Sequence, residues 1–528
     1  MLLHELVAAA RRELGLGARS LAAAGAGDAS RPAAVDLLVP DADAIARRVQ
    51  QLGGKYRPHA DALWNLANGT DAGTVLPVGV TDALRATQLR ALAHDALADA
   101  FVDGAHIGRR AMSRAPRVTG NTAKILVQDA EYLPRLWQDI RSAERSVTIT
   151  MYNIEDAGSG ERLLQELTAL KQRKPGVDIR LVLDAHGTNE PGKARGRALL
   201  QRLDDAGIRY VVSSSPLRPR GGGWEHRKIV VIDDRVIYQG GLGFAGTEAG
   251  KYGTWMDAMV RMEGPVGAVG AVHSLAMWND LTRTVDDAAR ARLAAARDVL
   301  HGQRMLAPAP PRDAELGIDP HVASITGDTA HDVPITLLEN RPRIDLAITE
   351  QFLRDAARVG PGDQFLATSS YLTSPTASRA VEGAARAGAD TRVVLSAISG
   401  NNDVPFVRIG RTFYRGLLDS GVQLTQWEGR MMHHKSWLMR HGDAVAVNVG
   451  SMNLSNMSLR FSRESTARME GEAIARQYHR FHETLRTTSD PTRFNGGHSR
   501  TIGPEEIGTE RSDHILGAVR AVVPRAGF

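Results

Sequence analysis

Residues 226–241 of this chain read HRKIVVIDDRVIYQGG, and residues 433–451 read HHKSWLMRHGDAVAVNVGS. Each stretch opens with a His-x-Lys triplet, continues as an apolar run, turns at polar residues and returns as a second apolar run that ends in small residues. Two such runs joined by a short polar turn are typical of a β-hairpin. With 17 histidines and only eight lysines, roughly 0.3 His-x-Lys triplets are expected by chance. Two triplets in matching contexts therefore indicate an internal duplication.

The hairpins are expected to place each histidine beside its lysine. In an extended chain, residues i and i+2 point to the same face. His226 should therefore project with Lys228, and His433 with Lys435. The side chain of His434 should point to the opposite face and take no part. This geometry places a nucleophile or proton donor beside a fixed cation.

The same alternation of helix and strand precedes both hairpins. In the first half it predicts helices at 132–143 and 160–171 and strands at 146–152 and 177–184. In the second half it predicts helices at 349–359 and 378–387 and strands at 364–371 and 391–396. The fold class is therefore α/β, with two similar lobes, each an α-β-α sandwich with a mixed sheet. A pseudo-two-fold relation would bring both triplets into one cleft between the lobes.

Five segments are predicted along the chain: a helical N-terminal region at 1–120, the first lobe at 121–300, a linker at 301–335, the second lobe at 336–485 and a C-terminal tail at 486–528. The first segment is rich in Ala, Leu and Arg and has helical periodicity, but it carries no interpretable motif. A proline-rich run at 307–312 marks the linker. The Gly, Ser and Pro content of the tail predicts a loose segment.

The composition limits the kinds of chemical site and the cellular locations that we expect for this chain. The chain has no cysteine, which excludes disulfides, thiolate metal sites and thiol nucleophiles. It shows no secretory signal and no apolar run of the length that crosses a bilayer. We therefore expect a cytoplasmic protein, or one exported without a classical signal, that contacts membranes peripherally. The net charge of +5 suits an anionic phospholipid surface or a nucleic acid, but the arginines are spread along the chain and do not choose between them.

The two stretches resemble the phospholipase D superfamily, whose signature His-x-Lys-x4-Asp usually occurs twice in one chain. The first copy fits fully, with His226, Lys228 and Asp233. In the second copy Arg440 stands where the Asp belongs, and Asp443 follows three positions later. Because Asp443 has the same spacing to the next Gly turn as Asp233 has, we take it as the counterpart across a local insertion.

Further motifs extend the resemblance over roughly residues 125–475. The first half carries Gly240-Gly241, Trp255-x-Asp257 and Glu263-Gly264-Pro265; the second half carries Gly450-Ser451-x-Asn453 and Glu464. Each of these pieces is weak alone, but the set is specific.

The resemblance implies a phosphohistidine mechanism that needs no metal and no cofactor. His226 would attack phosphorus, and His433 would protonate the leaving alcohol and then activate the incoming water or alcohol. Because coupled groups titrate together, the sequence leaves open which histidine is the nucleophile. Lys228 and Lys435, joined by Asn453 and Ser451, would hold the phosphoryl oxygens.

The remaining candidates would support these groups. Asp233 and Asp443 would orient the lysines and the hairpin backbone. Asp257 and Glu464 would orient the imidazoles from behind, and Gly241 is grouped with them.

Three functions stay open on the sequence. The first is a phospholipase D or transphosphatidylase that acts on a phospholipid surface as a monomer with two motifs. Cardiolipin synthesis, a narrower form, ranks lower because such relatives usually carry N-terminal membrane helices. The second is a nucleic-acid phosphodiesterase, although small nucleases of the superfamily resemble single-motif dimers. The third is a catalytically silent binding protein, which only Arg440 supports.

Overall fold

The computed structural model describes residues 117–155, 157–188, 194–213, 224–244, 255–282, 286–300, 316, 318, 324–341, 345–401 and 404–506. The helical region expected at 1–120 therefore lies outside the described residues up to position 116. The proline-rich run at 307–312 lies outside them too.

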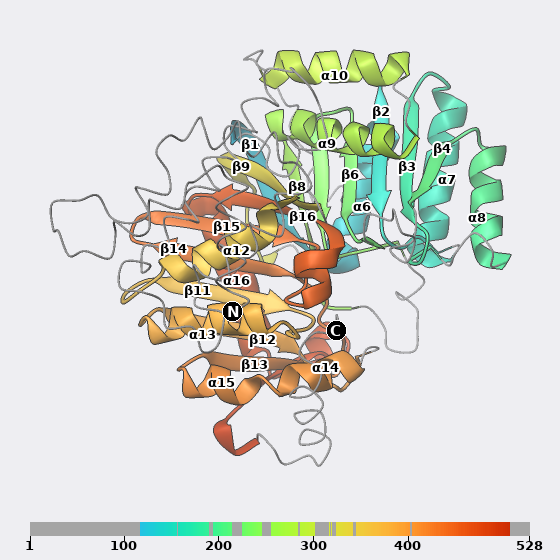
Figure 1. Cartoon of the computed structure of the whole chain (residues 1–528). Helices are drawn as coiled ribbons and strands as arrows, with labels where there is room; N and C mark the ends of the chain where they lie inside the picture. Colours follow the sequence, from blue (N-terminus) through green and yellow to red (C-terminus); the bar gives the residue numbers. More distant parts are fainter. Residues whose placement is uncertain are drawn as a thin grey trace, which may run out of the picture.

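The strands of the first lobe form one mixed sheet (Figure 1). In spatial order they are β4 (Arg209–Ser213), β3 (Asp178–Asp184), β2 (Ser146–Met151), β6 (Lys228–Ile232), β7 (Val236–Gly240), β8 (Ala258–Glu263) and β1 (Val118–Val127). Strands β2, β3 and β4 are parallel, and the other pairings are antiparallel. The predicted hairpin at 226–241 is β6 and β7.

The second lobe repeats this order. Its strands are β13 (Gln423–Glu428), β12 (Asp390–Ser396), β11 (Gln364–Ser369), β14 (Ser436–His441), β15 (Ala444–Gly450), β16 (Ser462–Glu470) and β9 (Ala330–Arg341). Again the first three are parallel. The predicted α/β fold of two similar lobes with mixed sheets is thus confirmed.

The two sheets join through β1 and β9, which pair antiparallel, with Val118 opposite Ile335 and Ala123 opposite Ala330. In Figure 1 these strands lie side by side, blue against yellow, where the lobes meet. Two shorter strands extend the junction: β5 (Trp224–Glu225) runs parallel to the start of β16, and β10 (Asp345–Leu346) pairs with the end of β9. The lobes therefore share a continuous hydrogen-bonded sheet.

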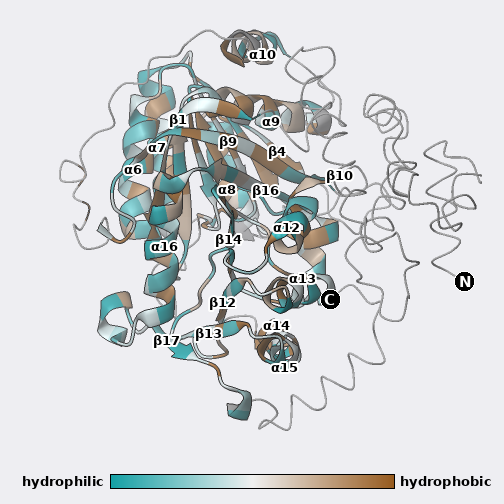
Figure 2. Cartoon of the chain, turned by 90° about the vertical axis from the view of Figure 1, so that its left-hand side faces the viewer, coloured by the Kyte–Doolittle hydropathy of each residue, from teal (hydrophilic) through white to brown (hydrophobic). Residues whose placement is uncertain are grey.

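Helices cover both faces of this sheet. One face carries α9 (Pro265–Thr282) with α10 (Asp287–Leu300) in the first lobe and α16 (Glu472–Thr487) in the second. The opposite face carries α6 (Gln128–Ser142), α7 (Gly158–Arg173), α8 (Ala194–Asp205), α12 (Ala347–Arg358), α13 (Pro375–Arg386), α14 (Val404–Arg411) and α15 (Tyr414–Asp419). In Figure 2 the hydrophobic colour gathers on the strands between the helix layers.

The core under α9 and α16 is continuous across the lobes. It joins Ile125 and Val269 of the first lobe to Leu337 and Phe481 of the second, all of them buried. Burial of apolar surface is the main favourable term in folding, so the lobes stabilise each other. Among the described residues, none of the helices combines the length and the apolar character that spanning a bilayer requires.

Two predicted boundaries differ from the structure. The linker was expected to reach residue 335, but β9 begins at Ala330, and the hydroxyl of Thr326 already donates to the carbonyl of Ile125 at 2.8 Å. The tail was expected to be loose from 486, but β17 (His498–Thr501) pairs with β13, and Phe494 packs on Trp427. Pro491 begins a turn that Gly496 and Gly497 close before β17, whereas Ser499 lies in the strand itself.

Candidate active site

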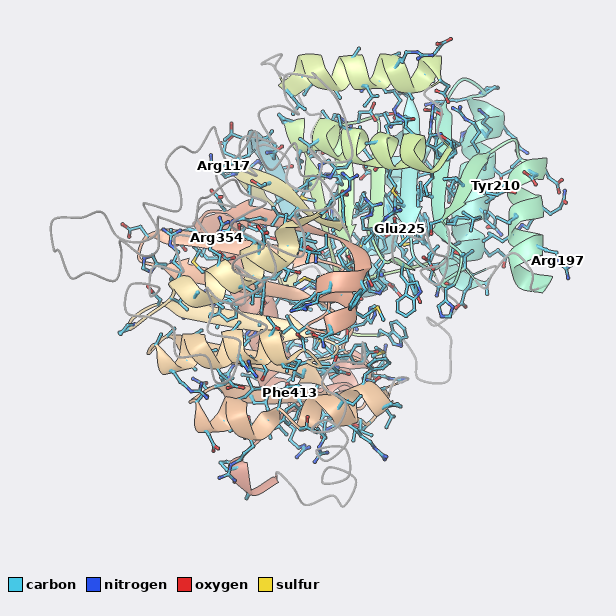
Figure 3. The ribbon with its side chains drawn as sticks, viewed as in Figure 1. Arg117, Arg197, Tyr210, Glu225, Arg354 and Phe413 are labelled. Carbon is cyan, nitrogen blue, oxygen red and sulfur yellow. The ribbon has the colours of Figure 1, made fainter. Side chains whose placement is uncertain are left out.

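The two His-x-Lys triplets lie where the lobes meet, and each is held there by the other lobe. The backbone N–H of His226 donates to the carbonyl of Arg463 at 2.9 Å, and that of His433 donates to the carbonyl of Met256 at 2.8 Å. In Figure 3 Glu225, which precedes His226, lies between the two lobes. The pseudo-two-fold relation therefore extends from the sheet to the histidine backbone.

Each imidazole contacts a carboxylate of the opposite lobe. His226 Nδ1 lies 3.0 Å from both carboxylate oxygens of Glu464, and His433 Nδ1 lies 2.8 Å from Asp257 Oδ2. Both carboxylates are fully buried. A hydrogen on Nδ1 that points to a carboxylate leaves a lone pair on Nε2, which is what an attacking or proton-accepting imidazole needs. The expectation that one site requires both lobes agrees with this arrangement.

The two carboxylates are fixed by their own lobes. Asp257 Oδ1 accepts the N–H of Ala258 at 2.7 Å. A Cβ at Gly241 would lie 2.4 Å from the same oxygen, so only glycine lets Asp257 occupy this place. Glu464 accepts the hydroxyl of Ser451, whose oxygen in turn accepts the N–H of Ser465 at 3.1 Å. Gly241 and Ser451 therefore support the two carboxylates that contact the imidazoles.

The two lysines are buried beside their histidines. Lys228 Nζ donates to the carbonyl of His226 at 2.7 Å and lies 5.0 Å from the centre of the Tyr152 ring. Lys435 Nζ donates to the carbonyl of His433 in the same way. Burial lowers the pKa of Lys228 to about 8, although nearby carboxylates oppose the shift. The site thus contains two lysine side chains that can bind an anion.

Burial also keeps both imidazoles neutral. It is the largest cause that lowers the pKa of His433, to about 3, and Lys435 adds to it while Asp257 opposes it. Burial lowers the pKa of His226 as well, with Glu464 opposing. A phosphate anion between the rings would raise both pKa values, because it offsets the lysine charges. An anion bound between the rings would therefore favour protonation of His433.

The structure does not bring Asp233 or Asp443 to the lysines, which corrects the expectation that these carboxylates orient them. Asp233 lies in the β6–β7 turn, at the opposite end of β6 from Lys228. There its carboxylate accepts the N–H groups of residues 144–146 at 2.7 to 2.9 Å. Asp443 is exposed in the β14–β15 turn. The aspartate of the signature is a turn residue here, since it fixes the hairpin to the start of β2.

In the second lobe Asp363, which immediately precedes β11, provides this turn contact. Its carboxylate accepts the N–H of Gly442 at 3.0 Å and contacts His441 Nδ1 at 2.7 Å. Arg440, which stands at the signature position of the aspartate, pairs instead with Glu472 at 3.0 Å. The departure from the signature is therefore compensated by a carboxylate that the motif does not contain.

Asn453 lies just beyond β15, near Ser451, and is buried. In the part of the chain that the structure describes, its side-chain oxygen has no hydrogen-bond partner. A buried polar atom without a partner costs free energy, and a hydroxyl of a bound ligand or a water would satisfy it. This position is compatible with the expected contact to substrate.

The sequence alone does not identify His434 as part of this cluster. Its ring is fully buried, with Nδ1 3.6 Å from Asp257 Oδ1, the carboxylate oxygen that faces away from His433. His434 was expected to point to the opposite face and take no part, but its ring reaches the carboxylate that contacts His433. Tyr152 and Trp255 are also close, with ring centres 4.9 Å from His226 and 4.8 Å from His433.

Comparisons with known proteins agree with this geometry. The family described as "Cardiolipin synthase, PLD-like domain" matches residues 136–250 and 360–485. Cardiolipin synthase A of Yersinia pseudotuberculosis and that of Yersinia pestis are each 27% identical over 363 residues. These matches cover 66% of this chain and 66% of each relative, so the chain spans about two thirds of their length.

A solved structure shares the fold. Phosphatidylserine synthase of Haemophilus influenzae superimposes with a TM-score of 0.53 at 13% identity and covers 76% of this chain and 93% of its own. The two-lobed arrangement thus recurs in a protein of very different sequence.

Proposed function

Because the chain belongs to the phospholipase D superfamily, we propose that it is a phospholipid phosphodiesterase that transfers a phosphatidyl group through a phosphohistidine intermediate. The crossed histidine–carboxylate pairs carry the proposal. His226 pairs with Glu464 and His433 with Asp257, so each imidazole takes its orienting group from the other lobe. Two buried lysines complete a cluster suited to a phosphodiester anion.

The chemistry balances with these groups alone. Nε2 of His226 attacks phosphorus, and the bond from phosphorus to the head-group oxygen breaks. His433, which takes up a proton on Nε2 when the anionic substrate binds, gives that proton to the leaving oxygen and then takes a proton from the acceptor, which attacks the phosphohistidine and frees His226. Lys228 and Lys435 offset the charge that develops on the phosphoryl oxygens. Water as acceptor gives phosphatidate, and an alcohol gives a new phosphodiester.

The relatives favour transfer over hydrolysis. The relatives that match in sequence are named cardiolipin synthases. The sequence leaves hydrolysis and transfer open and ranks cardiolipin synthesis low, whereas the names of the relatives favour synthesis. We therefore propose an alcohol, such as the glycerol head group of a second phospholipid, as the acceptor.

Exposed aromatic side chains near the site support a lipid surface as the partner. Phe461 precedes the start of β16 and is 45% exposed, and Phe406 of α14 is 38% exposed. Phe406 packs on Tyr371, just beyond the end of β11 nearest to Lys435. Large apolar side chains at a water-facing surface suit insertion among lipids. A nucleic acid has no apolar interior into which these side chains could insert.

The test is product analysis on vesicles of phosphatidylglycerol with a trace of a primary alcohol, with His226→Ala and His433→Ala as matched variants. We expect cardiolipin and phosphatidylalcohol from the wild type, and a loss of at least about 10³-fold in both variants. Histidine-dependent cleavage of single-stranded DNA with intact lipid would move the protein to the nuclease branch. No turnover of either substrate would favour the silent binding protein.

The same assay tests the lipid surface. A variant with Phe406→Ser and Phe461→Ser should lose activity on vesicles and keep it on a short-chain, monomeric phospholipid. Equal activity on vesicles would remove these side chains from membrane contact.

A further inference from the structure

The two halves of the site are not built alike. Glu464, which orients His226, receives a hydrogen bond from the hydroxyl of Ser451. The first-lobe counterpart of Ser451 is Gly241, which follows β7 as Ser451 follows β15. Because the Asp257 carboxylate fills the space of a Cβ at Gly241, no hydroxyl can reach Asp257 from that position.

His434 lies beside Asp257, the carboxylate that no hydroxyl reaches from position 241. Its Nδ1 is 3.6 Å from Asp257 Oδ1, and its ring meets the Phe481 ring edge-on at 4.8 Å. Neither ring nitrogen of His434 has a hydrogen-bond partner within the described residues. The corresponding residue of the first triplet, Arg227, is instead engaged with Glu225 and Glu339. The ring of His434 thus lies beside Asp257, and the hydroxyl of Ser451 lies beside Glu464.

We propose that His434 is a positioning residue, which adds a side-chain contact to Asp257 beside the N–H of Ala258 and so holds this carboxylate against His433. The inference rests on the proposed function, because it assigns a role within that site. The distance of 3.6 Å from His434 Nδ1 to Asp257 Oδ1 is longer than a hydrogen bond. The imidazole therefore acts on the buried carboxylate charge through its dipole. In a buried site such a contact is stronger than in water, and it limits rotation of the carboxylate.

The groups that face His434 determine its charge. Asp257 and the carbonyl of Ala258 lie on one side, Lys435 and His433 flank it in the sequence, and Phe481 of α16 covers the ring. Burial lowers the pKa of His434, and Asp257 opposes that effect. Burial therefore favours the neutral ring, and in this proposal the N–H of that ring faces Asp257. Without it, Asp257 would attract a proton on His433 more strongly.

The test compares His434→Phe, which keeps the ring but removes the N–H, with His434→Asn, whose amide N–H replaces that of Nδ1. For His434→Phe we expect kcat to fall about 10- to 100-fold with little change in KM. Because His433 must be protonated to donate, the limb of the pH profile that reports its deprotonation should move to higher pH. His434→Asn should restore most of kcat. Ser451→Ala, the matched change in the other half, should give a similar loss, and His441→Asn, at the far turn, should give none.

A second readout separates this proposal from the proposed function. In imidazole-¹⁵N-labelled full-length protein, the pKa of His433 should be higher in His434→Phe than in the wild type, whether or not lipid is turned over. An unchanged His433 titration and unchanged kinetics in a folded His434→Phe variant would overturn the proposal. So would equal impairment of the Asn and Phe variants at wild-type Tm, because packing would then account for the effect. Loss of lipid turnover in the wild type, with the shift present, would refute only the proposed function.

Discussion

Asp257 and Glu464 show how single residues make one site from two lobes. Both were predicted from the sequence as groups that orient imidazoles, but the sequence does not say which histidine each one serves. That information is tertiary, because Asp257 and His433 are separated by more than a hundred residues and no local pattern links them. The contact of His434 with Asp257 was likewise hidden, since it also joins residues far apart in the sequence.

At this scale we predict that Asp257→Asn lowers kcat about 10³-fold with a small change in KM. An amide that accepts the His433 N–H has no charge to stabilise the imidazolium, as in other histidine–carboxylate pairs. Glu464→Gln should do the same through His226. The measurement is steady-state transfer on vesicles, with Asp443→Asn as the control that leaves kcat unchanged. Additive losses in the double variant would mean that the two pairs act in separate steps; we expect less than additive losses.

The pH dependence of the site follows from Lys228, whose pKa burial lowers to about 8. Since the charged lysine binds the phosphoryl oxygens, kcat/KM should decline as pH rises through about 8. Stability should change in the opposite sense. The cost of burying the charged lysine is fully present below pH 8, and it is relieved as the lysine deprotonates between this value and its unfolded value of 10.5. Rate profiles and chemical denaturation of the wild type from pH 6 to 10 measure both.

A Lys228→Arg variant is the matched control, because arginine stays charged throughout this range. Its residual activity should show no decline near pH 8. An alkaline limb that persists unchanged in this variant would assign the titration to another group.

At the scale of elements, the sequence predicts most helices and strands of the lobes because their apolar periodicity is strong. Strand 146–152, for example, corresponds to β2, and helix 349–359 corresponds to α12. Boundaries that depend on long-range pairing were missed. Nothing local distinguishes β17 from a loose tail, because its partner β13 lies far away in the sequence.

The hairpin turns give a prediction about stability. Asp233 adopts a left-handed backbone conformation with φ of 54° and accepts three backbone N–H groups. Asp233→Ala should therefore lower the free energy of unfolding by about 1–3 kcal/mol, whereas Asp443→Ala should change it by less than about 0.5 kcal/mol. Urea denaturation of both variants measures the difference. Asp363→Ala should resemble Asp233→Ala, and a large effect of Asp443→Ala would restore that residue as the counterpart of Asp233.

At the scale of the whole molecule, the duplication was visible in the sequence, but the way the halves join was not. The sequence predicts two lobes that face each other. The structure shows in addition that β1 and β9 pair, and that one apolar core runs beneath both lobes. Edge-to-edge pairing leaves little sequence signal, since a strand with two neighbours resembles any buried strand.

This junction predicts that the chain can be divided between residues 308 and 309 and still assemble. The β1–β9 ladder and the shared core should bring two co-expressed halves together, and vesicle assays should then recover a substantial part of the transfer activity. Each half alone should be inactive, because the first carries His226 without Glu464 and the second carries His433 without Asp257. Asp257→Asn in the first half should abolish the recovered activity, although His433 lies in the other fragment. Turnover by either half alone, at any concentration, would show that a single lobe completes its own site and would contradict the crossed arrangement.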